Sequence, residues 1–462
     1  MYLNFFKTSK FLLYLVPLTV VIVTVGTLFP FIVGKYVAFR SITGISLILF
    51  LLGLLFGSES EKYYKKIKEV FKRPLFQAFT AFTASMQIVS IFSYRPHFSF
   101  WSNFERGEGG LQILFLYAFV FLLFVLFENF EDWRKLFWTM VGASVLMILY
   151  GIGAGLKHMG PELKKIFGRF IGPAFSQENL RFKGSIGNPA YVGTYLLFSL
   201  FFSSYLITGF KKKLKNWHTW VLSAAMVVFL FFLFMTGTRG AFLGLIAGIG
   251  VGMIYLAVTK KSWRKPLIAL ILTGLIIFGI GVSFQDTKVI KNIPGSRVFD
   301  ISLQEESLQD RFKIWGIAWD GFKQRPITGW GPENFNWIFY KHYDVDMYDG
   351  NGNFGAWFDR AHNVFLDYLT QAGIIGFLSY ASLYVVFFWQ FFKKKLHTKV
   401  SKIAMSLMLA LIVGYLTQAM ILFEVLPIYI SLFVFLAFGG YLFWQDDLNK
   451  LQATNSKPQD KN

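Results

Sequence analysis

The chain alternates between long apolar runs and short loops that carry most of its lysines and arginines. A helix that crosses a bilayer needs roughly 20 mostly apolar residues, and about twelve runs approach that length. We expect them near residues 11–33, 42–57, 75–93, 111–127, 136–156, 190–209, 218–235, 240–258, 266–284, 364–391, 403–421 and 425–444. The pattern predicts an all-α, polytopic membrane helix bundle of about 12 transmembrane helices, of which the second and fourth are the shortest.

Basic clusters indicate how these helices are oriented. Five clusters follow the second, fourth, sixth, eighth and tenth runs, so all five fall on one side of the membrane. They are Lys62, Lys65, Lys66, Lys68, Lys72 and Arg73; Arg134 and Lys135; Lys211, Lys212, Lys213 and Lys215; Lys260, Lys261, Arg264 and Lys265; and Lys393, Lys394, Lys395, Lys399 and Lys402. Basic loops favour the cytoplasmic side, which predicts a multi-pass protein of the cytoplasmic membrane with both termini inside.

Composition supports a membrane protein and excludes several other classes. The 462 residues are 55% hydrophobic and 19% aromatic, more apolar surface than a soluble fold of this size buries. The net charge of +20 would favour nucleic-acid binding in a soluble protein, but the charges lie in the loops and no nucleic-acid partner is expected. The absence of cysteine excludes disulfides and thiolate chemistry. The first run follows Lys7 and Lys10 without a cleavage motif, so it is read as an uncleaved span.

Five regions follow from this pattern. They are N-terminal helices in 1–156, a central region with arginine-bearing outer loops in 157–284, a large extracytoplasmic loop in 285–363, C-terminal helices in 364–444 and a polar cytoplasmic tail in 445–462. Between Pro161 and Gly172, apolar residues recur at helical spacing with basic residues on the other faces. This segment is typical of a helix lying in the membrane interface, or of an ordinary loop helix packed on the bundle.

The large loop is long enough to hold elements of its own. Ser302 and Glu305 fit a capping box at the start of a helix that ends before Pro326. Its expected apolar face consists of Leu308, Phe312, Trp315, Trp319 and Phe322. Arg311 falls at the edge of that face, and Trp330 lies in a glycine-rich turn, where it could stack on a sugar or pack the loop onto the bundle.

Cationic groups gather at outward-facing segment ends. Arg181 opens a glycine-rich stretch with Lys183 and Asn188, a combination of cations and accessible backbone amides that suits a phosphate. Arg239 lies in the tight turn between the seventh and eighth runs, where a charge between two apolar helices needs a partner or a function. The alternatives are an incidental basic pair at Arg181 and an Arg239 that snorkels to lipid headgroups.

One histidine stands apart from the other five. His362 directly precedes an apolar run and follows Arg360, with Asn363 beside it. Neutral imidazole is well suited to act as a general base near pH 7, and Asp359 could orient it. A capping or headgroup-facing histidine is the alternative. The sequence has no phosphate-binding Walker loop, no nucleophile elbow and no zinc-binding histidine pair, so we expect no metal and no cofactor.

Taken together, these motifs resemble the O-antigen ligase and O-antigen polymerase family of bacterial membrane glycosyltransferases. The resemblance rests on 184–189, 238–240, Arg311 with Trp315, 329–335 and His362-Asn363 followed by Gly373 and Gly376, with a weaker match at Arg106. It covers less than half of the chain. The order and spacing of these short motifs carry it.

The resemblance implies inverting transfer of a glycan from an undecaprenyl-diphosphate carrier to an acceptor hydroxyl, at the outer face of the membrane and without a metal. Arg181 and Arg239, with Arg360 as a third group, would hold the diphosphate, and His362 would be the base. Lys183, Asn188, Arg311, Trp330, Asn363 and Arg106 would support the site. The acceptor stays open among lipid A-core, a lipid-linked glycan and a protein hydroxyl. A transporter of lipid-linked oligosaccharides is the alternative function.

Overall fold

The computed structural model describes residues 4–103, 106–157, 181–210, 213–287, 290, 299, 306–343, 347, 357–393 and 400–455. The α-helices are α1 Phe5–Leu15, α2 Val33–Phe56, α3 Ser60–Val70, α4 Pro74–Ile91, α5 Pro96–Trp101, α6 Gly110–Leu126, α7 Phe130–Lys157, α9 Pro189–Thr208, α10 Trp217–Met235, α11 Arg239–Thr259, α12 Arg264–Ser283, α14 Glu306–Gln324, α15 Phe335–Lys341, α16 Val364–Lys393, α17 Lys402–Ala419 and α18 Leu426–Asn455. Short 3-10 helices are η1 Val16–Val21, η2 Lys213–Lys215 and η3 Lys261–Trp263. The interfacial helix expected after Pro161 and the capping box of Ser302 and Glu305 lie outside the described residues.

The predicted polytopic helical bundle is confirmed. Within the described ranges, nine helices are long and apolar enough to cross a membrane: α2, α7, α9, α10, α11, α12, α16, α17 and α18. The three other expected runs correspond to α4, to the 17-residue α6 and to α1 with η1. Helices are favoured because a backbone in lipid must satisfy its hydrogen bonds within itself.

The first expected span, 11–33, is wrong as one continuous helix. α1 ends at Leu15, and the chain continues as η1, which contains Pro17 at its N-terminal end. Proline lacks the N–H that an α-helix interior requires, so the α-helical hydrogen bonding stops there. Residues 22–32 then form an irregular segment before α2 begins at Val33.

α2 begins nine residues earlier than the expected run at 42, and the two cations in its first turns have partners within the protein. Lys35 donates to the backbone oxygens of Ile22 and Ser185. Arg40 donates from Nε to the Gln112 side chain at 2.8 Å and also to the backbone oxygen of Gly107. Polar groups at this depth are tolerated when they have such partners.

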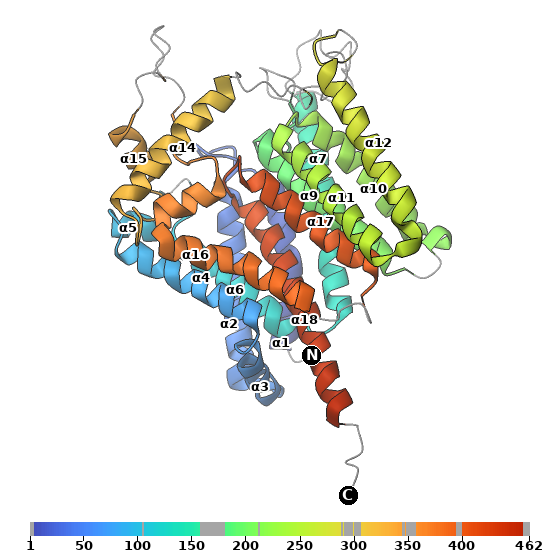
Figure 1. Ribbon diagram of the computed structural model, residues 1–462. Coiled ribbons are helices and arrows are strands. Elements are labelled where there is room, and N and C mark those ends of the chain that lie inside the picture. The colour runs from blue at the N-terminus through green and yellow to red at the C-terminus, as the bar shows by residue number, and fades with distance from the viewer. Residues whose placement is uncertain are drawn as a thin grey trace, which may run out of the picture.

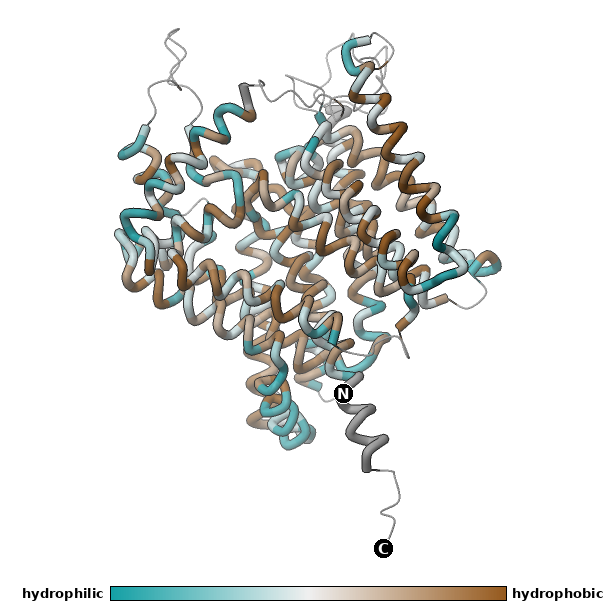
Figure 2. Tube along the Cα trace, viewed as in Figure 1, coloured by the Kyte–Doolittle hydropathy of each residue, from teal (hydrophilic) through white to brown (hydrophobic). Residues whose placement is uncertain are grey.

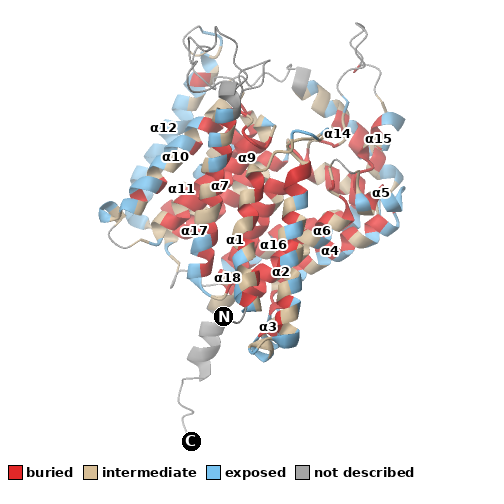
Figure 3. Cartoon of the chain, turned by 180° about the vertical axis from the view of Figure 1, so that it is seen from behind, coloured by how far each residue is buried: buried red, intermediate tan, exposed pale blue. Residues whose placement is uncertain are grey.

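The helices surround a central pair. Most of α9 and α18 is buried, whereas α12 packs along one side of the bundle and leaves most of its surface exposed (Figure 3). The exposed surface of α12 is apolar (Figure 2), as expected for a helix facing lipid. α3 and both ends of the described chain lie at one end of the molecule, and α14 and α15 lie at the other (Figure 1).

Small residues allow α11 and α17 to pack in close contact. A Cβ atom at Gly244 would lie 2.4 Å from the Gly414 backbone oxygen, and one at Gly248 would lie 2.2 Å from the Ala410 backbone oxygen. Glycine-lined contacts of this kind are a common way for membrane helices to associate, because lipid supplies no hydrophobic force between them.

α16 is interrupted at Gly373, whose φ of 59° and ψ of −165° are not helical. The interruption exposes backbone groups, and the 326–331 segment pairs with them. Trp330 and Gly331 donate to the oxygens of Thr370 and Gln371 at 3.1 and 2.7 Å, while Ile374 donates to Pro326 at 2.8 Å. The glycine-rich turn is therefore docked onto the broken helix.

α14 is the helix expected before Pro326, but its buried face differs from the predicted one. Ile314, Ile317 and Ala318 are buried against α15, whereas Phe312 and Trp319 are about half exposed. The apolar face predicted from the sequence consists mainly of large aromatic residues. In a membrane protein large aromatic side chains also favour the membrane–water interface, so periodicity alone does not identify the buried face.

We predict that Gly248→Ala destabilises the fold by about 1–3 kcal/mol, because the added methyl group overlaps the Ala410 backbone. Gly250→Ala is the matched control on the same helix, since a Cβ atom there meets nothing within 4 Å. Thermal unfolding of the detergent-purified variants measures both. Equal melting temperatures for the two variants would contradict the close α11–α17 packing.

Candidate functional site

A cavity of about 530 Å³ lies where α2, α9, the 357–362 segment and the loop between α17 and α18 meet. Its walls include Lys35, Arg106, Asn188, His362 and Phe423. A volume of this size is within the range of small-molecule sites. Three of the candidate residues from the sequence, His362, Arg106 and Asn188, therefore face one space.

His362 is held in a defined orientation in the wall of this cavity. Its ring lies edge-on to two phenyl rings, with centroid distances of 5.3 Å to Phe358 and 4.9 Å to Phe423. Its Nδ1 is 3.1 Å from the backbone oxygen of Arg360. A carbonyl oxygen can only accept, so Nδ1 carries the proton and Nε2 is left as the basic nitrogen.

The backbone at His362 is left-handed, with φ of 51°. Such a conformation is uncommon for a residue with a Cβ atom and is often found at functional sites. Burial lowers the pKa of His362 to about 4. The charges of Arg311 and Arg106 also lower this pKa, whereas the Arg360 backbone oxygen and Asp359 act to raise it. The imidazole is therefore neutral at pH 7.

Asn363 anchors the helix that follows His362. Its side-chain oxygen accepts from the backbone N–H groups of Phe365 and Leu366 at 3.0 and 3.2 Å, which caps the first turn of α16. In addition, the backbone N–H of Ala361 donates to Asp367 at 2.7 Å. These contacts fix the loop on both sides of the histidine.

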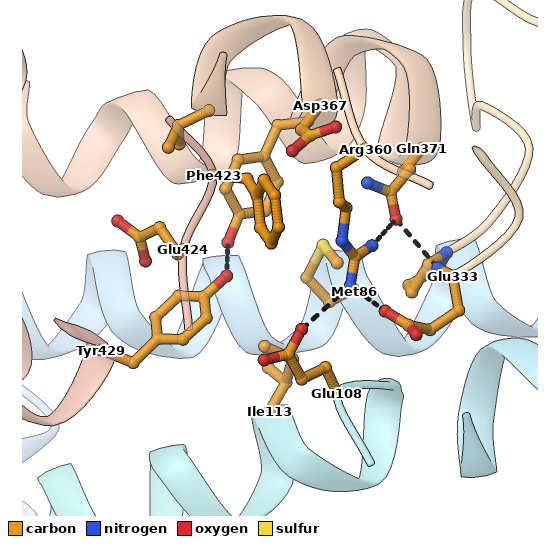
Figure 4. Close-up of a pocket in the computed structure, with 13 residues that line it drawn as sticks. Met86, Glu108, Ile113, Glu333, Arg360, Asp367, Gln371, Phe423, Glu424 and Tyr429 are labelled. Carbon is orange, nitrogen blue, oxygen red and sulfur yellow. Dashed lines mark hydrogen bonds and ion pairs between the residues drawn. The ribbon is translucent and has the colours of Figure 1, made fainter. Parts of the chain in front are cut away.

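Arg360 does not line the cavity but lines a small adjoining pocket of about 50 Å³ (Figure 4). It forms ion pairs with Glu108, at 3.0 Å, and with Glu333, and its Nη1 donates to Gln371 at 2.8 Å. Glu108 and Phe423 line both the pocket and the cavity. The guanidinium is thus occupied by protein carboxylates.

The pKa values of Glu108 and Glu333 are shifted in opposite directions. Burial raises the pKa of Glu108 to about 7, although Arg360 opposes the shift. Burial also acts to raise the pKa of Glu333, but Arg360 and Arg106 outweigh it and hold that pKa below its usual value. Across the pocket, burial raises the pKa of Glu424 to about 8, and Tyr380 donates to this carboxyl at 3.0 Å.

Arg181 and Arg239 come together at a second place. Arg181 donates from Nε to the Thr236 backbone oxygen at 2.7 Å and from Nη2 to the Thr238 hydroxyl at 3.1 Å, in the turn that precedes Arg239. Neither arginine belongs to the residues that line the cavity or the small pocket. This turn packs on Gly193 of α9, the helix whose N-terminal residues Asn188 and Tyr191 line the cavity.

The glycine-rich stretch after Arg181 is shaped by close packing. Gly184 and Gly187 have φ values of 49° and 87°, and a Cβ atom at Gly187 would lie 2.4 Å from the Phe31 ring. Asn188 caps α9 by accepting from the Ala190 backbone at 2.8 Å. The Lys183 backbone oxygen accepts from Gly187 at 2.9 Å, which closes the loop.

Trp330 is buried, and its Nε1 donates to the Gly321 backbone oxygen at 2.8 Å. This contact favours the packing alternative for that side chain over stacking on a sugar. Arg106 lines the cavity and forms an ion pair with Asp359. Its guanidinium lies 5.6 Å from the centre of the Phe423 ring.

Sequence reasoning missed three groups of the site: Lys35, Glu108 and Phe423. Lys35 falls between the first two expected spans and was not considered as a site residue. The available signal was a lysine surrounded by apolar residues, with no acidic residue close to it in sequence. Glu108 and Phe423 gave no comparable signal, because their positions depend on how distant helices pack.

Comparison with known families places this geometry in context. Residues 224–381 match a family model described as O-Antigen ligase. This part of the chain is therefore similar to the O-antigen ligase family. The matched region extends from α10 into α16 and includes Arg239, Arg311, Arg360 and His362, whereas Lys35 and Arg181 lie before it. No curated protein matches the chain.

The O-antigen ligase family match supports a role in glycosyl transfer during surface-polysaccharide synthesis. The nine apolar helices agree with a multi-pass membrane protein.

We predict that Arg360→Met lowers stability by about 3–5 kcal/mol near pH 8, because it leaves Glu108 and Glu333 buried without their cation. Without the cation, burial raises the pKa of Glu108 further and is no longer outweighed by Arg360 at Glu333, so the pKa of Glu333 rises as well. The deficit should therefore shrink as the pH falls to 5 and the carboxyls become protonated. Arg95→Met is the control, since Arg95 is exposed and its guanidinium lies over the rings of Trp337 and Phe98 rather than against a carboxylate among the described residues. Melting temperatures at both pH values measure the effect, and a deficit independent of pH would contradict this account.

Proposed function

We propose that the protein transfers a glycan from an undecaprenyl-diphosphate carrier to an acceptor hydroxyl, with inversion, at the outer face of a bacterial cytoplasmic membrane. The observation that carries the proposal is the orientation of His362, whose Nδ1 is tied to a backbone oxygen beside a cavity large enough for sugars. That tautomer leaves Nε2 as the group able to accept a proton from a hydroxyl.

In this reaction the acceptor hydroxyl attacks the anomeric carbon as its proton passes to Nε2 of His362. The bond between the anomeric carbon and the phosphate oxygen breaks, and its electron pair leaves with the diphosphate. Attack from the face opposite the diphosphate inverts the anomeric centre. Clamping by Phe358 and Phe423 keeps the imidazole in place for this step.

Arg181 and Arg239 would hold the carrier diphosphate. Arginine suits this role because its planar fork meets phosphate oxygens in pairs. Cations beside a departing diphosphate stabilise the charge that grows in the transition state, so the step needs no metal and no nucleotide. The contacts of Arg360 favour a positioning role for that residue, through the backbone oxygen that accepts from His362.

The proposed location of the site at the outer face rests on which helices lie at each end of the bundle. α3, with its lysines, and both ends of the described chain lie at one end of the bundle, whereas α14, against which Ala361 packs, lies at the other (Figure 1). Because basic segments favour the cytoplasm, the His362 end would face outward. The acceptor stays open among lipid A-core, a second lipid-linked glycan and a protein hydroxyl.

A transporter of lipid-linked oligosaccharides is the alternative function. Transporters often bind substrate at broken helices near the middle of the membrane, and α16 is broken at Gly373. The backbone groups exposed there are taken by the 326–331 segment rather than left to face a ligand. This pairing favours the transferase.

We expect purified protein in membrane vesicles to transfer the glycan of an undecaprenyl-diphosphate oligosaccharide to one of the three acceptors, offered separately. His362→Ala should reduce the turnover number by about 100-fold or more, the usual contribution of a general base, with little change in donor binding. His342 is a partly exposed histidine that contacts Gln324 and lies outside the cavity lining, so His342→Ala should leave transfer unchanged. Movement of labelled lipid across the bilayer without transfer to any acceptor would favour the transporter.

The pH dependence of transfer provides a second test. A histidine with the ordinary pKa near 6.5 would lose about tenfold in its basic form between pH 7.5 and 5.5. Because burial lowers the pKa of His362 to about 4, the basic form persists over that range. We therefore expect kcat/KM to change less than about twofold from pH 7.5 to 5.5. An acid limb centred near 6.5 would contradict a buried neutral base.

A further inference from the structure

Lys35 is a buried cation in the wall of the His362 cavity. It lies in the first turn of α2 and is only 2% exposed. Its Nζ donates to two backbone oxygens, those of Ile22 and Ser185, both at 2.7 Å. Within the described parts of the chain, no carboxylate forms an ion pair with it. The ammonium is therefore held by neutral dipoles alone.

An ammonium group in this setting favours an anionic partner. Moving such an ion out of water costs several kcal/mol even after the protein relaxes, and carbonyl dipoles offset only part of that cost. An ammonium has three N–H donors, of which two are used here. Because Lys35 lines the cavity, its remaining donor has a space from which a ligand can approach.

The other charges that face this space are already paired. Arg106 is paired with Asp359, and Glu108 is paired with Arg360 behind the wall. Among the described lining residues, this leaves the charge of Lys35 without a counter-charge. α9 also begins at the cavity, after Asn188, and the positive end of its helix dipole adds to the attraction for an anion.

The rest of the lining is suited to sugar rings. Phe29, Phe31, Tyr191, Trp357, Phe358 and Phe423 all line the cavity. Aromatic faces of this kind pack against the apolar faces of pyranose rings, while polar groups at the edges select the substituents. A buried cation among aromatic rings is therefore placed to select a glycan that carries a negative charge.

We propose that Lys35 is the anion-binding residue of the His362 cavity and pairs with an oxyanion of the lipid-linked glycan, a carrier phosphate or the carboxylate of an acidic sugar. This proposal rests on the proposed function. It also goes beyond it, because it gives the cavity a binding group separate from the Arg181 and Arg239 turn. Substrate binding would then place the oxyanion on the N-terminal side of α9, with the acceptor hydroxyl toward His362.

Lys35→Gln and Lys35→Arg separate charge from structure. The glutamine amide keeps two N–H donors for the two backbone oxygens but removes the charge, whereas arginine keeps the charge. Lys66→Gln is the matched control. Lys66 lies on α3 and is also largely buried, but its Nζ is paired with Glu128 at 3.0 Å. Binding to the three variants and the wild type would be measured for farnesyl diphosphate, farnesol, a glucuronate-bearing oligosaccharide and its glucose-bearing counterpart.

We expect Lys35→Gln to weaken binding of one anionic probe by at least about tenfold, the usual effect of losing a contact with a charged group. The neutral counterpart should bind equally to wild type and variant, and Lys35→Arg should retain most of the affinity. If Lys35→Gln loses affinity for farnesyl diphosphate, the anion that Lys35 binds is the carrier phosphate. If it loses affinity for the glucuronate probe, the anion is the carboxylate of an acidic sugar. Equal affinity of Lys35→Gln and wild type for both anions would overturn the proposal.

Photo-crosslinking of the wild type tests the same assignment without a variant, in case Lys35→Gln does not fold. A photoreactive analogue of each anionic probe should label peptides around residues 29–35 and 185–188. Labelling only around residues 236–241 would place the anion at the arginine turn and overturn the role of Lys35, while leaving the proposed function intact. If neither anion binds or labels the protein and no glycan is transferred, the proposed function fails as well.

Discussion

The buried guanidinium of Arg360 is the interaction on which the geometry of the site depends. It joins Glu108, before α6, to Glu333, before α15, and Gln371 in α16. These three groups come from parts of the chain far apart in sequence, and removing the shared cation would leave two carboxylates in a poorly solvated pocket. The same residue supplies the backbone oxygen that orients His362. One residue therefore connects the packing of α6, α15 and α16 to the orientation of the proposed base.

Around this cluster the structure follows one constraint, that backbone groups removed from water must find partners. The break in α16 at Gly373 is tolerated because Gly331, Ile374 and their neighbours restore the lost hydrogen bonds. The irregular segment between η1 and α2 is likewise held by Lys35, which donates to the backbone oxygens of Ile22 and Ser185. In each case polar contacts help to keep an irregular segment of the site in place.

The cations of the site fall into groups with different surroundings. Arg181 and Arg239 lie at the α10–α11 turn, Arg360 is enclosed by carboxylates, and Lys35 and Arg106 face the cavity. In a medium where unpaired charges are costly, a cation that lacks a protein counter-charge is the one best placed to meet an anionic substrate. Charge pairing, more than the number of cations, therefore distinguishes positioning residues from candidate binding residues.

The sequence by itself determined the membrane bundle, because long apolar runs leave a chain no other stable environment, and basic loops indicated its orientation. It also singled out His362, Arg181 and Arg239 as candidates, since polar residues at span ends stand out against apolar surroundings. It misjudged the continuous span at 11–33 and the buried face of α14, where Pro17 and interfacial aromatics override the simple pattern. Only the tertiary structure showed that Arg360 is paired with Glu108 and Glu333, and that no carboxylate among the described residues is paired with Lys35. These pairings depend on which distant segments of the chain contact each other in the folded protein, and a local sequence pattern does not specify such contacts.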